Sequence, residues 1–250
     1  MLIQACLNGS RGPGDHPAIP FTLEHVAADA DATMRAGAGA LHVHPRRDDL
    51  SESIAAADVA AVCTAVRKAC PGLPVGVTTA AWIKPELERR LLAIEAWTVV
   101  PDYASVNVGE AGALDVITLL NRKGIGVEAG VWTEDDARLF VAEGLDAAVL
   151  RVLVEVQAVE APKEAVALAR RIDAVLDHGL AQAPRLHHGG GRATWHVIEA
   201  AIENGHDVRI GFEDTTVDMH GDSAPHNAAL VAQAVELAAR AGRVVDRTAR

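Results

Sequence analysis

Short apolar runs alternate with longer helical patterns from one end of the chain to the other, and this alternation constrains the fold more than any other feature. Each run is rich in Val, Ile or Leu, as is typical of strands buried on both faces of a parallel sheet. We expect eight such strands, at residues 2–8, 40–44, 75–79, 103–108, 126–131, 148–156, 185–188 and 208–213.

The segments between these strands have apolar residues at three- and four-residue spacing, as in residues 23–36, 54–70 and 85–96, which predicts helices. Thr133 stands ahead of three acidic residues, a signal for a helix start. No linker divides the chain, so eight strand–helix units predict an α/β fold, a (β/α)8 TIM barrel that is a single domain over residues 1–250. An open doubly wound sheet is the alternative, although no Gly-x-Gly-x-x-Gly motif follows the first strand.

The composition limits the partners that the chain can have. Half of the residues are hydrophobic and 3% are aromatic, which suits aliphatic strands covered by Ala-rich helices. The formal net charge of −11 argues against nucleic acid, because phosphate binding requires clustered Lys and Arg. The three cysteines form no Cys-x-x-Cys pair, and no apolar stretch reaches the length of a membrane span. We therefore expect a cytoplasmic protein that binds neither nucleic acid nor a membrane.

Two histidines, His42 and His44, stand one residue apart at the end of the second predicted strand. Side chains two positions apart on a strand point to the same side, so the two imidazoles would lie together. Pro45 would end the strand there, at the C-terminal edge where such barrels carry their catalytic groups. The pair could be half of a metal site, or two polar residues hydrogen-bonded to backbone.

The last predicted strand carries Arg209, Gly211 and Glu213 at alternate positions, so they would share one face. The eighth strand neighbours the first in a closed barrel, and Glu213 could meet His42 and His44 across the mouth. Two histidines and a carboxylate suit a divalent ion acting as a Lewis acid, zinc first, with iron or manganese as further options. Alternatively, Glu213 pairs with Arg209 or caps a loop.

Two further groups are costly to bury without a partner or a function. Arg209 needs either a carboxylate, such as the neighbouring Asp214, or an anionic substrate. Glu128 lies within an otherwise apolar strand, so it is a candidate functional carboxylate.

Polar residues also end several other predicted strands. Thr78, Thr79 and Asn107 could hold a substrate carboxylate or carbonyl, or satisfy backbone groups at the strand ends. Asn8 and Ser105 occupy similar positions in the first and fourth strands and are candidates for the same role.

Three glycines follow the seventh predicted strand and lead into a helix. Backbone N–H groups at a helix start favour phosphate, so Gly189 and Gly190 are candidates for binding a phosphorylated ligand or the tail of coenzyme A. A flexible loop without a ligand is the alternative.

Taken in order, several segments resemble the β-keto acid cleavage enzyme family, whose best-known members are 3-keto-5-aminohexanoate cleavage enzymes. The most specific segment is Val-Arg-Ile-Gly-Phe-Glu-Asp at residues 208–214. The others are residues 16–22, 37–46, 78–79, 104–109 and 227–231, together with Gly221. The resemblance covers most of the chain.

The resemblance implies a TIM barrel with a divalent metal, usually zinc, held by His42, His44 and Glu213. It also implies a retro-Claisen type exchange, in which a β-keto acid and acetyl-CoA, a coenzyme A thioester, give acetoacetate and a new acyl-CoA. The assembly implied is a homotetramer.

The resemblance also assigns catalytic roles. Arg209 and Asp214 would form the dyad that assists carbonyl attack and proton transfer. Thr78 would replace a hydroxyl residue of the family near the substrate, and Glu128 matches its fifth-strand glutamate. Departures fall in the substrate and coenzyme regions: Ala80 and Ala81 replace two glycines, and the sixth and seventh strands lack the family's usual endings.

Two other functions remain open. A metal-dependent hydrolase of the amidohydrolase type also uses His-x-His in a barrel, but on strand one and with histidines on strands five and six, where this chain has Glu128 and Arg151. A metal-stabilised binding protein without catalytic activity would also retain His42 and His44.

Overall fold

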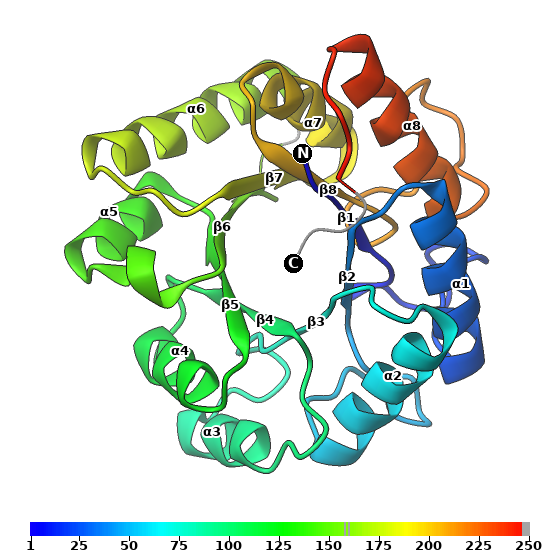
Figure 1. Cartoon of the computed structure of the whole chain (residues 1–250), viewed down its shortest axis with the longest axis vertical. Coiled ribbons are helices and arrows are strands. Elements are labelled where there is room, and N and C mark those ends of the chain that lie inside the picture. Colours follow the sequence, from blue (N-terminus) through cyan, green and yellow to red (C-terminus); the bar gives the residue numbers. More distant parts are fainter. Residues whose placement is uncertain (158, 160, 247–250) are drawn as a thin grey trace.

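Within residues 1–157, 159 and 161–246, which this computed structural model describes, eight parallel strands close into a barrel in the order β1 to β8 (Figure 1). The strands are β1 (Ile3–Cys6), β2 (Ala40–Val43), β3 (Val75–Thr78), β4 (Tyr103–Asn107), β5 (Gly126–Val131), β6 (Arg151–Val156), β7 (Arg185–Gly189) and β8 (Asp207–Ile210). The predicted TIM barrel is confirmed, and the alternative of an open sheet is wrong because β8 pairs with β1.

Helices surround the barrel and cover its outer face (Figure 1). They are α1 (Leu23–Ala36), α2 (Ala56–Ala69), α3 (Leu87–Glu95), α4 (Ala113–Arg122), α5 (Glu134–Ala142), α6 (Pro162–His178), α7 (Thr194–Glu203) and α8 (Asn227–Arg240). The predicted helix start at Thr133 is confirmed: its side chain accepts from the Asp136 N–H, and Asp136 accepts from the Thr133 N–H in return. The core between helices and sheet is aliphatic, as the composition predicts.

The fifth predicted strand, residues 126–131, has the bounds expected, whereas the other seven differ at one end or both. The largest shifts, of three residues, are in the sixth and eighth strands. The sixth begins at Arg151, because Leu145–Ala148 forms a short 3-10 helix ahead of it. The eighth ends at Ile210, because the N–H groups of Asp214 and Thr215 both donate to the Gly211 carbonyl, at 2.9 and 3.0 Å, and turn the chain.

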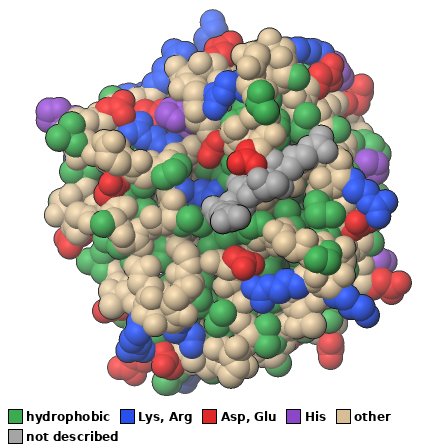
Figure 2. Space-filling model, viewed as in Figure 1, with side chains coloured by type: hydrophobic (Ala, Val, Ile, Leu, Met, Phe, Trp, Pro, Cys, Tyr) green, Lys and Arg blue, Asp and Glu red, His purple; other side chains and the backbone are tan. Residues whose placement is uncertain are grey.

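The N-terminus and residues 244–246 meet at one end of the barrel. At the end where the strands begin, the Met1 ammonium donates to the Val244 carbonyl at 2.7 Å and the Asp246 N–H donates to the Met1 carbonyl at 2.8 Å. Acidic and basic side chains are interspersed with apolar ones on the face seen in Figure 2. No helix among the described residues is long and apolar enough to cross a bilayer.

The barrel interior contains a buried polar layer of Gln4, Tyr103, Glu128 and Arg151. Gln4 Nε2 donates to Glu128 Oε1 at 2.6 Å and to the Tyr103 hydroxyl at 3.0 Å. Arg151 Nε lies 3.2 Å from the same Glu128 oxygen, and the Tyr103 hydroxyl donates to the Leu41 carbonyl at 2.6 Å. These contacts tie β1, β2, β4, β5 and β6 together inside the barrel.

Gly76 on β3 makes room for the Tyr103 ring of this layer, since a Cβ at Gly76 would lie 1.9 Å from Tyr103 Cε2. We therefore expect Gly76→Ala to lower the free energy of unfolding by about 1–3 kcal/mol, as overpacking does in well-packed cores. Urea unfolding measures this. Gly14→Ala is the control, because nothing lies within 4 Å of a Cβ there; equal stability of the two variants would contradict the packing argument.

Candidate active site

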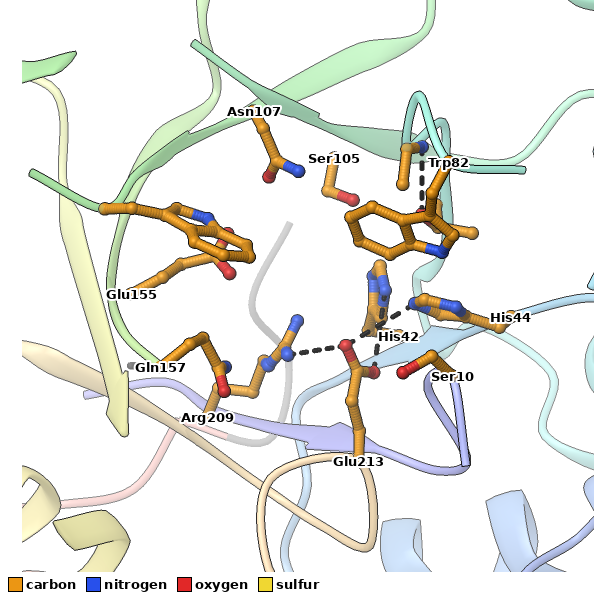
Figure 3. A pocket seen from close by; sticks show the side chains of 13 residues that line it. Ser10, His42, His44, Trp82, Ser105, Asn107, Glu155, Gln157, Arg209 and Glu213 are labelled. Carbon is orange, nitrogen blue, oxygen red and sulfur yellow. Dashed lines mark hydrogen bonds and ion pairs between the residues drawn. The ribbon is translucent and has the colours of Figure 1, made fainter. Parts of the chain in front are cut away.

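A cavity of about 130 Å³ opens at the C-terminal ends of the strands (Figure 3). It is lined by Ser10, His42, His44, Thr78, Ala80, Trp82, Ser105, Asn107, Trp132, Glu155, Gln157, Arg209 and Glu213. Figure 3 shows the two histidines and Glu213 on one side of the cavity, with Glu155 and Gln157 on the other. Many of the predicted site residues therefore face one enclosed space.

His42, His44 and Glu213 converge as the sequence predicts. His42 Nε2 lies 3.8 Å from Glu213 Oε2, and His44 Nε2 lies 3.4 Å from Glu213 Oε1. One ligand atom from each residue lies within 4.8 Å of the others. The arrangement leaves a space between three donor atoms that one ion can occupy.

Glu213 reaches the histidines by a route other than the one expected from strand alternation, which is wrong because β8 ends at Ile210. The following turn brings Gly211 against β1, where a Cβ would lie 1.9 Å from the Cys6 carbonyl oxygen. The Glu213 N–H also points at that oxygen, at 3.4 Å. The missing side chain of Gly211 thus allows the turn that presents Glu213.

The protonation states of His42 and Glu213 fit a divalent metal, whereas burial lowers the pKa of His44 but Glu213 and Glu52 outweigh burial and raise it. Burial lowers the pKa of His42 to about 3, so this imidazole is neutral. Burial raises the pKa of Glu213, but Arg209 and the two histidines outweigh burial and hold it well below its usual value. His42 Nδ1 and Glu213 Oε2 are buried without a hydrogen-bond partner among the described residues. A neutral imidazole and an anionic carboxylate with unused buried atoms form a suitable donor set.

Glu52 lies in a loop after β2 and supports the group formed by His42, His44 and Glu213. The sequence did not predict this residue. Its Oε1 lies 2.5 Å from His44 Nδ1, and its Oε2 accepts from Trp82 Nε1 at 3.1 Å. A carboxylate on Nδ1 orients the ring so that Nε2 faces the ligand position. No periodicity marks Glu52, because it is placed by an isolated bridge between residues 46 and 52.

A buried series of alternating charges runs behind the cavity. Arg209 Nη2 lies 2.8 Å from Glu213 Oε1 and 3.1 Å from Asp214 Oδ1. His188 lies 3.1 Å from Asp214 through Nδ1 and 3.4 Å from Glu155 through Nε2. Burial raises the pKa of Asp214, yet Arg209 and His188 hold it at about 2. Burial and Arg209 lower the pKa of His188, but Asp214 and Glu155 raise it to about 9. Asp214 is thus anionic and His188 cationic at neutral pH.

Two predicted substrate-binding residues serve the backbone instead. Asn8 Nδ2 donates to the carbonyls of Pro20 and His44 at 3.1 Å each, and Asn8 Oδ1 accepts from the His44 N–H at 2.9 Å. Thr79 Oγ1 donates to the Ser105 carbonyl at 2.7 Å. Neither lines the cavity. Asn8 therefore positions His44, and Thr79 fastens β3 to β4.

Thr78, Ser105 and Asn107 line the cavity. Thr78 Oγ1 accepts from the Ala80 N–H at 3.1 Å, which leaves its hydroxyl proton free to donate. Asn107 Nδ2 donates to Glu110 Oε1 at 2.8 Å, so its second N–H and its carbonyl oxygen are left for a ligand.

Three other candidates lie outside the cavity lining. Glu128 belongs to the buried polar layer, where burial raises its pKa although Arg151 lowers it. Gly189 ends β7, and the Gly190 N–H donates to the Val156 carbonyl at 2.8 Å. The Gly191 N–H donates to the Asp214 carbonyl at 2.9 Å. The expectation that this loop offers free N–H groups to phosphate is therefore wrong for Gly190 and Gly191.

Six cavity residues were not among the predicted site residues: Ser10, Ala80, Trp82, Trp132, Glu155 and Gln157. Glu155 lies on β6 and Gln157 directly follows it. The rule that polar strand ends face the site could have found these two, because Glu155 is next to the end of the sixth predicted strand and Gln157 directly follows that strand.

Comparison with known proteins agrees with this geometry. The family model described as beta-keto acid cleavage enzyme matches residues 1–250. The 3-keto-5-aminohexanoate cleavage enzyme of Fusobacterium nucleatum subsp. nucleatum is 26% identical, over 98% of this chain and 93% of that protein. The 3-oxoadipate:acetyl-CoA acetyltransferase of Cupriavidus necator is 28% identical, over 92% of this chain and 85% of that protein.

Solved structures of ObcA share the fold. Its binary complex with oxaloacetate matches with a TM-score of 0.75 and 16% identity, over 93% of this chain and 66% of that one. Its ternary complex with a C4-CoA adduct and oxalate matches with a TM-score of 0.77, over the same shares. At this identity the likeness concerns the fold.

Glu52 provides a test of the candidate metal site that leaves His42, His44 and Glu213 in place. We expect Glu52→Gln to weaken metal affinity by about 10–100-fold, since losing a carboxylate behind a ligating histidine has effects of this size. Competition with a chromophoric chelator measures the affinity. Asp48→Asn, an exposed change in the same loop, is the control; equal affinities in both variants would show that Glu52 does not support His44.

His188 makes the fold sensitive to alkaline pH. Its pKa in the folded state, about 9, exceeds the ordinary 6.5, so its stabilising contribution is complete below pH 6.5 and is lost as pH rises through 9. We expect wild type to lose on the order of 1–3 kcal/mol more unfolding free energy than His188→Gln between pH 6.5 and 9.5. Urea unfolding at both pH values measures this, with His178→Gln as an exposed control on α6. Equal losses in wild type and His188→Gln would contradict the assignment.

Proposed function

Because the chain belongs to the beta-keto acid cleavage enzyme family, we propose that its barrel cavity is the active site where a β-keto acid and acetyl-CoA become acetoacetate and a new acyl-CoA. Family membership, which the motifs predicted, is confirmed. The observation that carries the site is the approach of His42, His44 and Glu213 to one another beside Arg209. Family membership favours this reaction over an amidohydrolase-type hydrolase or a binding protein.

The reaction exchanges two acyl groups without an oxidant or reductant. The bond between the α-carbon and the β-carbonyl carbon of the keto acid breaks, and the β-acyl group becomes bound to the coenzyme A sulfur. The acetyl group leaves that sulfur and forms a carbon–carbon bond with the carboxymethyl fragment. One carbon–carbon bond and one thioester are broken, and one of each is formed.

Arg209 is the catalytic cation of the proposed site. Its guanidinium lines the cavity and lies 2.8 Å from Glu213. Asp214 does not line the cavity but holds Arg209 through Nε and Nη2, at 3.5 and 3.1 Å. Asp214 therefore acts as a positioning residue that fixes the guanidinium where negative charge develops on substrate oxygens.

The remaining groups bind and orient the keto acid. A divalent ion at His42, His44 and Glu213, most simply Zn²⁺, supplies a Lewis acid for the keto acid oxygens. The Thr78 hydroxyl donates a hydrogen bond to the substrate, and Ser105 and Asn107 set its orientation. Zinc as the ion and a homotetramer as the assembly are proposals carried by the family resemblance.

The size of the cavity limits how coenzyme A binds. About 130 Å³ accommodates a small keto acid and the thioester end, so the nucleotide must remain outside the barrel mouth. Relatives fit this arrangement, since one is named an acetyl-CoA acetyltransferase and ObcA was solved with a C4-CoA adduct. Gly189 ends β7 and Gly190 directly follows it. Both are buried and the Gly190 N–H is bonded to the Val156 carbonyl, so we do not place the coenzyme on these two residues.

The direct test is purified, metal-loaded protein with a panel of β-keto acids and acetyl-CoA, followed by acetoacetate formation. We expect acetoacetate from at least one keto acid, and from none when acetyl-CoA is omitted. Failure of every member of a broad panel would overturn the proposed function.

Arg209→Ala should lower kcat by at least about 100-fold, because it removes a preorganised cation from the reacting charge. Metal content should be unchanged, since Arg209 is not a ligand. Arg209→Lys, which keeps the charge, tests whether the planar guanidinium is needed, and the exposed Arg47→Ala is the control. Loss of metal in Arg209→Ala would instead assign Arg209 to holding Glu213.

A further inference from the structure

Three metal-ligating side chains meet on the outer side of the barrel, away from the cavity. Asp173 comes from α6, His187 from β7, and His206 from the residue before β8. His187 Nε2 lies 3.3 Å from Asp173 Oδ1, and His206 Nε2 lies 3.7 Å from Asp173 Oδ2. One donor atom from each lies within 4.8 Å of the others. None of the three lines the cavity.

The two histidine rings are stacked beside Asp173, and a rotation of one ring brings both Nε2 lone pairs onto one ion. The His187 and His206 rings are stacked, with centroids 4.4 Å apart and planes at 13°. Both present Nε2 to the same carboxylate. The His187 side chain is 3% exposed, and its Nε2 faces Asp173 Oδ1 without hydrogen-bond geometry to any residue that the structure describes. An ion between the two atoms would satisfy this buried nitrogen.

We propose that Asp173, His187 and His206 form a second divalent-metal site. Two imidazoles and one carboxylate suit a borderline ion such as Zn²⁺. The Asp173 and His206 side chains are 16% and 22% exposed, so an ion can enter from solvent and keep water as a fourth ligand.

The charges around the cluster leave room for a cation. Arg185 Nη1 lies 3.0 Å from Asp173 Oδ1, and Arg185 Nη2 lies 2.5 Å from Asp177 Oδ1. Two carboxylates and one guanidinium leave one negative charge, which a divalent ion on neutral imidazoles converts to one positive charge. Arg185 contacts Oδ1 of Asp173, whereas Oδ2 of Asp173 faces His206.

The position of the cluster indicates a structural role. Strands β7 and β8 share two paired positions, Leu186 with Asp207 and His187 with Val208, whereas β6 and β7 share five. The proposed site joins Asp173 on α6 to His187 on β7 and to His206, directly before β8, at this short ladder. An ion bound there stabilises the folded state, because the unfolded chain does not hold the three ligands together.

The test is metal stoichiometry in protein stripped with a chelator, dialysed and titrated with Zn²⁺. Wild type should bind two ions per chain, and His206→Gln and His187→Gln one each, with acetoacetate formation retained. His44→Ala should also bind one ion, and the double variant His44→Ala with His206→Gln none. His178→Ala, an exposed histidine on α6, should still bind two.

Thermal unfolding distinguishes the two sites. At Zn²⁺ about 100-fold above Kd, His44→Ala should still gain roughly 5–10 °C in Tm from the second site. The double variant should lose this gain. Without metal, its Tm should equal that of metal-free His44→Ala. An unchanged stoichiometry in both His206→Gln and His187→Gln would overturn the proposal, whether or not the protein cleaves β-keto acids.

Discussion

The close contact between β1 and the turn after β8 is the constraint on which the site depends. A side chain at Gly211 would collide with the Cys6 carbonyl oxygen at 1.9 Å, and one at Gly9 would lie 2.2 Å from Glu213 Cγ. Both positions therefore need glycine for β1 to contact the turn after β8 with Glu213 in place; this contact is called the seam below. Because His42 lies on β2, His44 directly follows it and Glu213 follows β8, the three candidate ligands meet only when the barrel is closed across β1. Ring closure and formation of the site are one event.

The seam also carries a series of buried charges that would be costly singly. Glu213, Arg209, Asp214, His188 and Glu155 alternate in sign, and each lies within 3.4 Å of the next. Removing one member leaves its neighbours buried without a counter-charge, which costs more than the pair contributes. The position of the Arg209 charge in the cavity therefore depends on groups behind the cavity. Asp214 holds Arg209, and His188 in turn holds Asp214.

Strand-level features were predictable from sequence because buried parallel strands have a strong apolar signature, and α1 was predicted to the residue. The direction of side chains at strand ends was not predictable, because a polar residue there can face the cavity or bond to backbone. Thr78 faces the cavity, whereas its neighbour Thr79 and Asn8 both bond to backbone. Glu52 escaped prediction because a loop places it, and loops leave no periodicity to read.

Glu128 shows why burial of a charge in a barrel strand does not by itself mark a catalytic group. From sequence, a carboxylate in an apolar strand indicates function. In the structure it accepts from Gln4 and pairs with Arg151, while Tyr103 extends the same layer to the Leu41 carbonyl. Leu41 directly precedes His42 on β2, so this layer holds the strand that carries the first ligand. A barrel whose mouth must keep its ligands in register gains from polar contacts inside, because hydrogen bonds fix distances that aliphatic packing leaves adjustable. Glu128 thus contacts the strands beneath the site and does not line the cavity, and its predicted catalytic role stays a prediction.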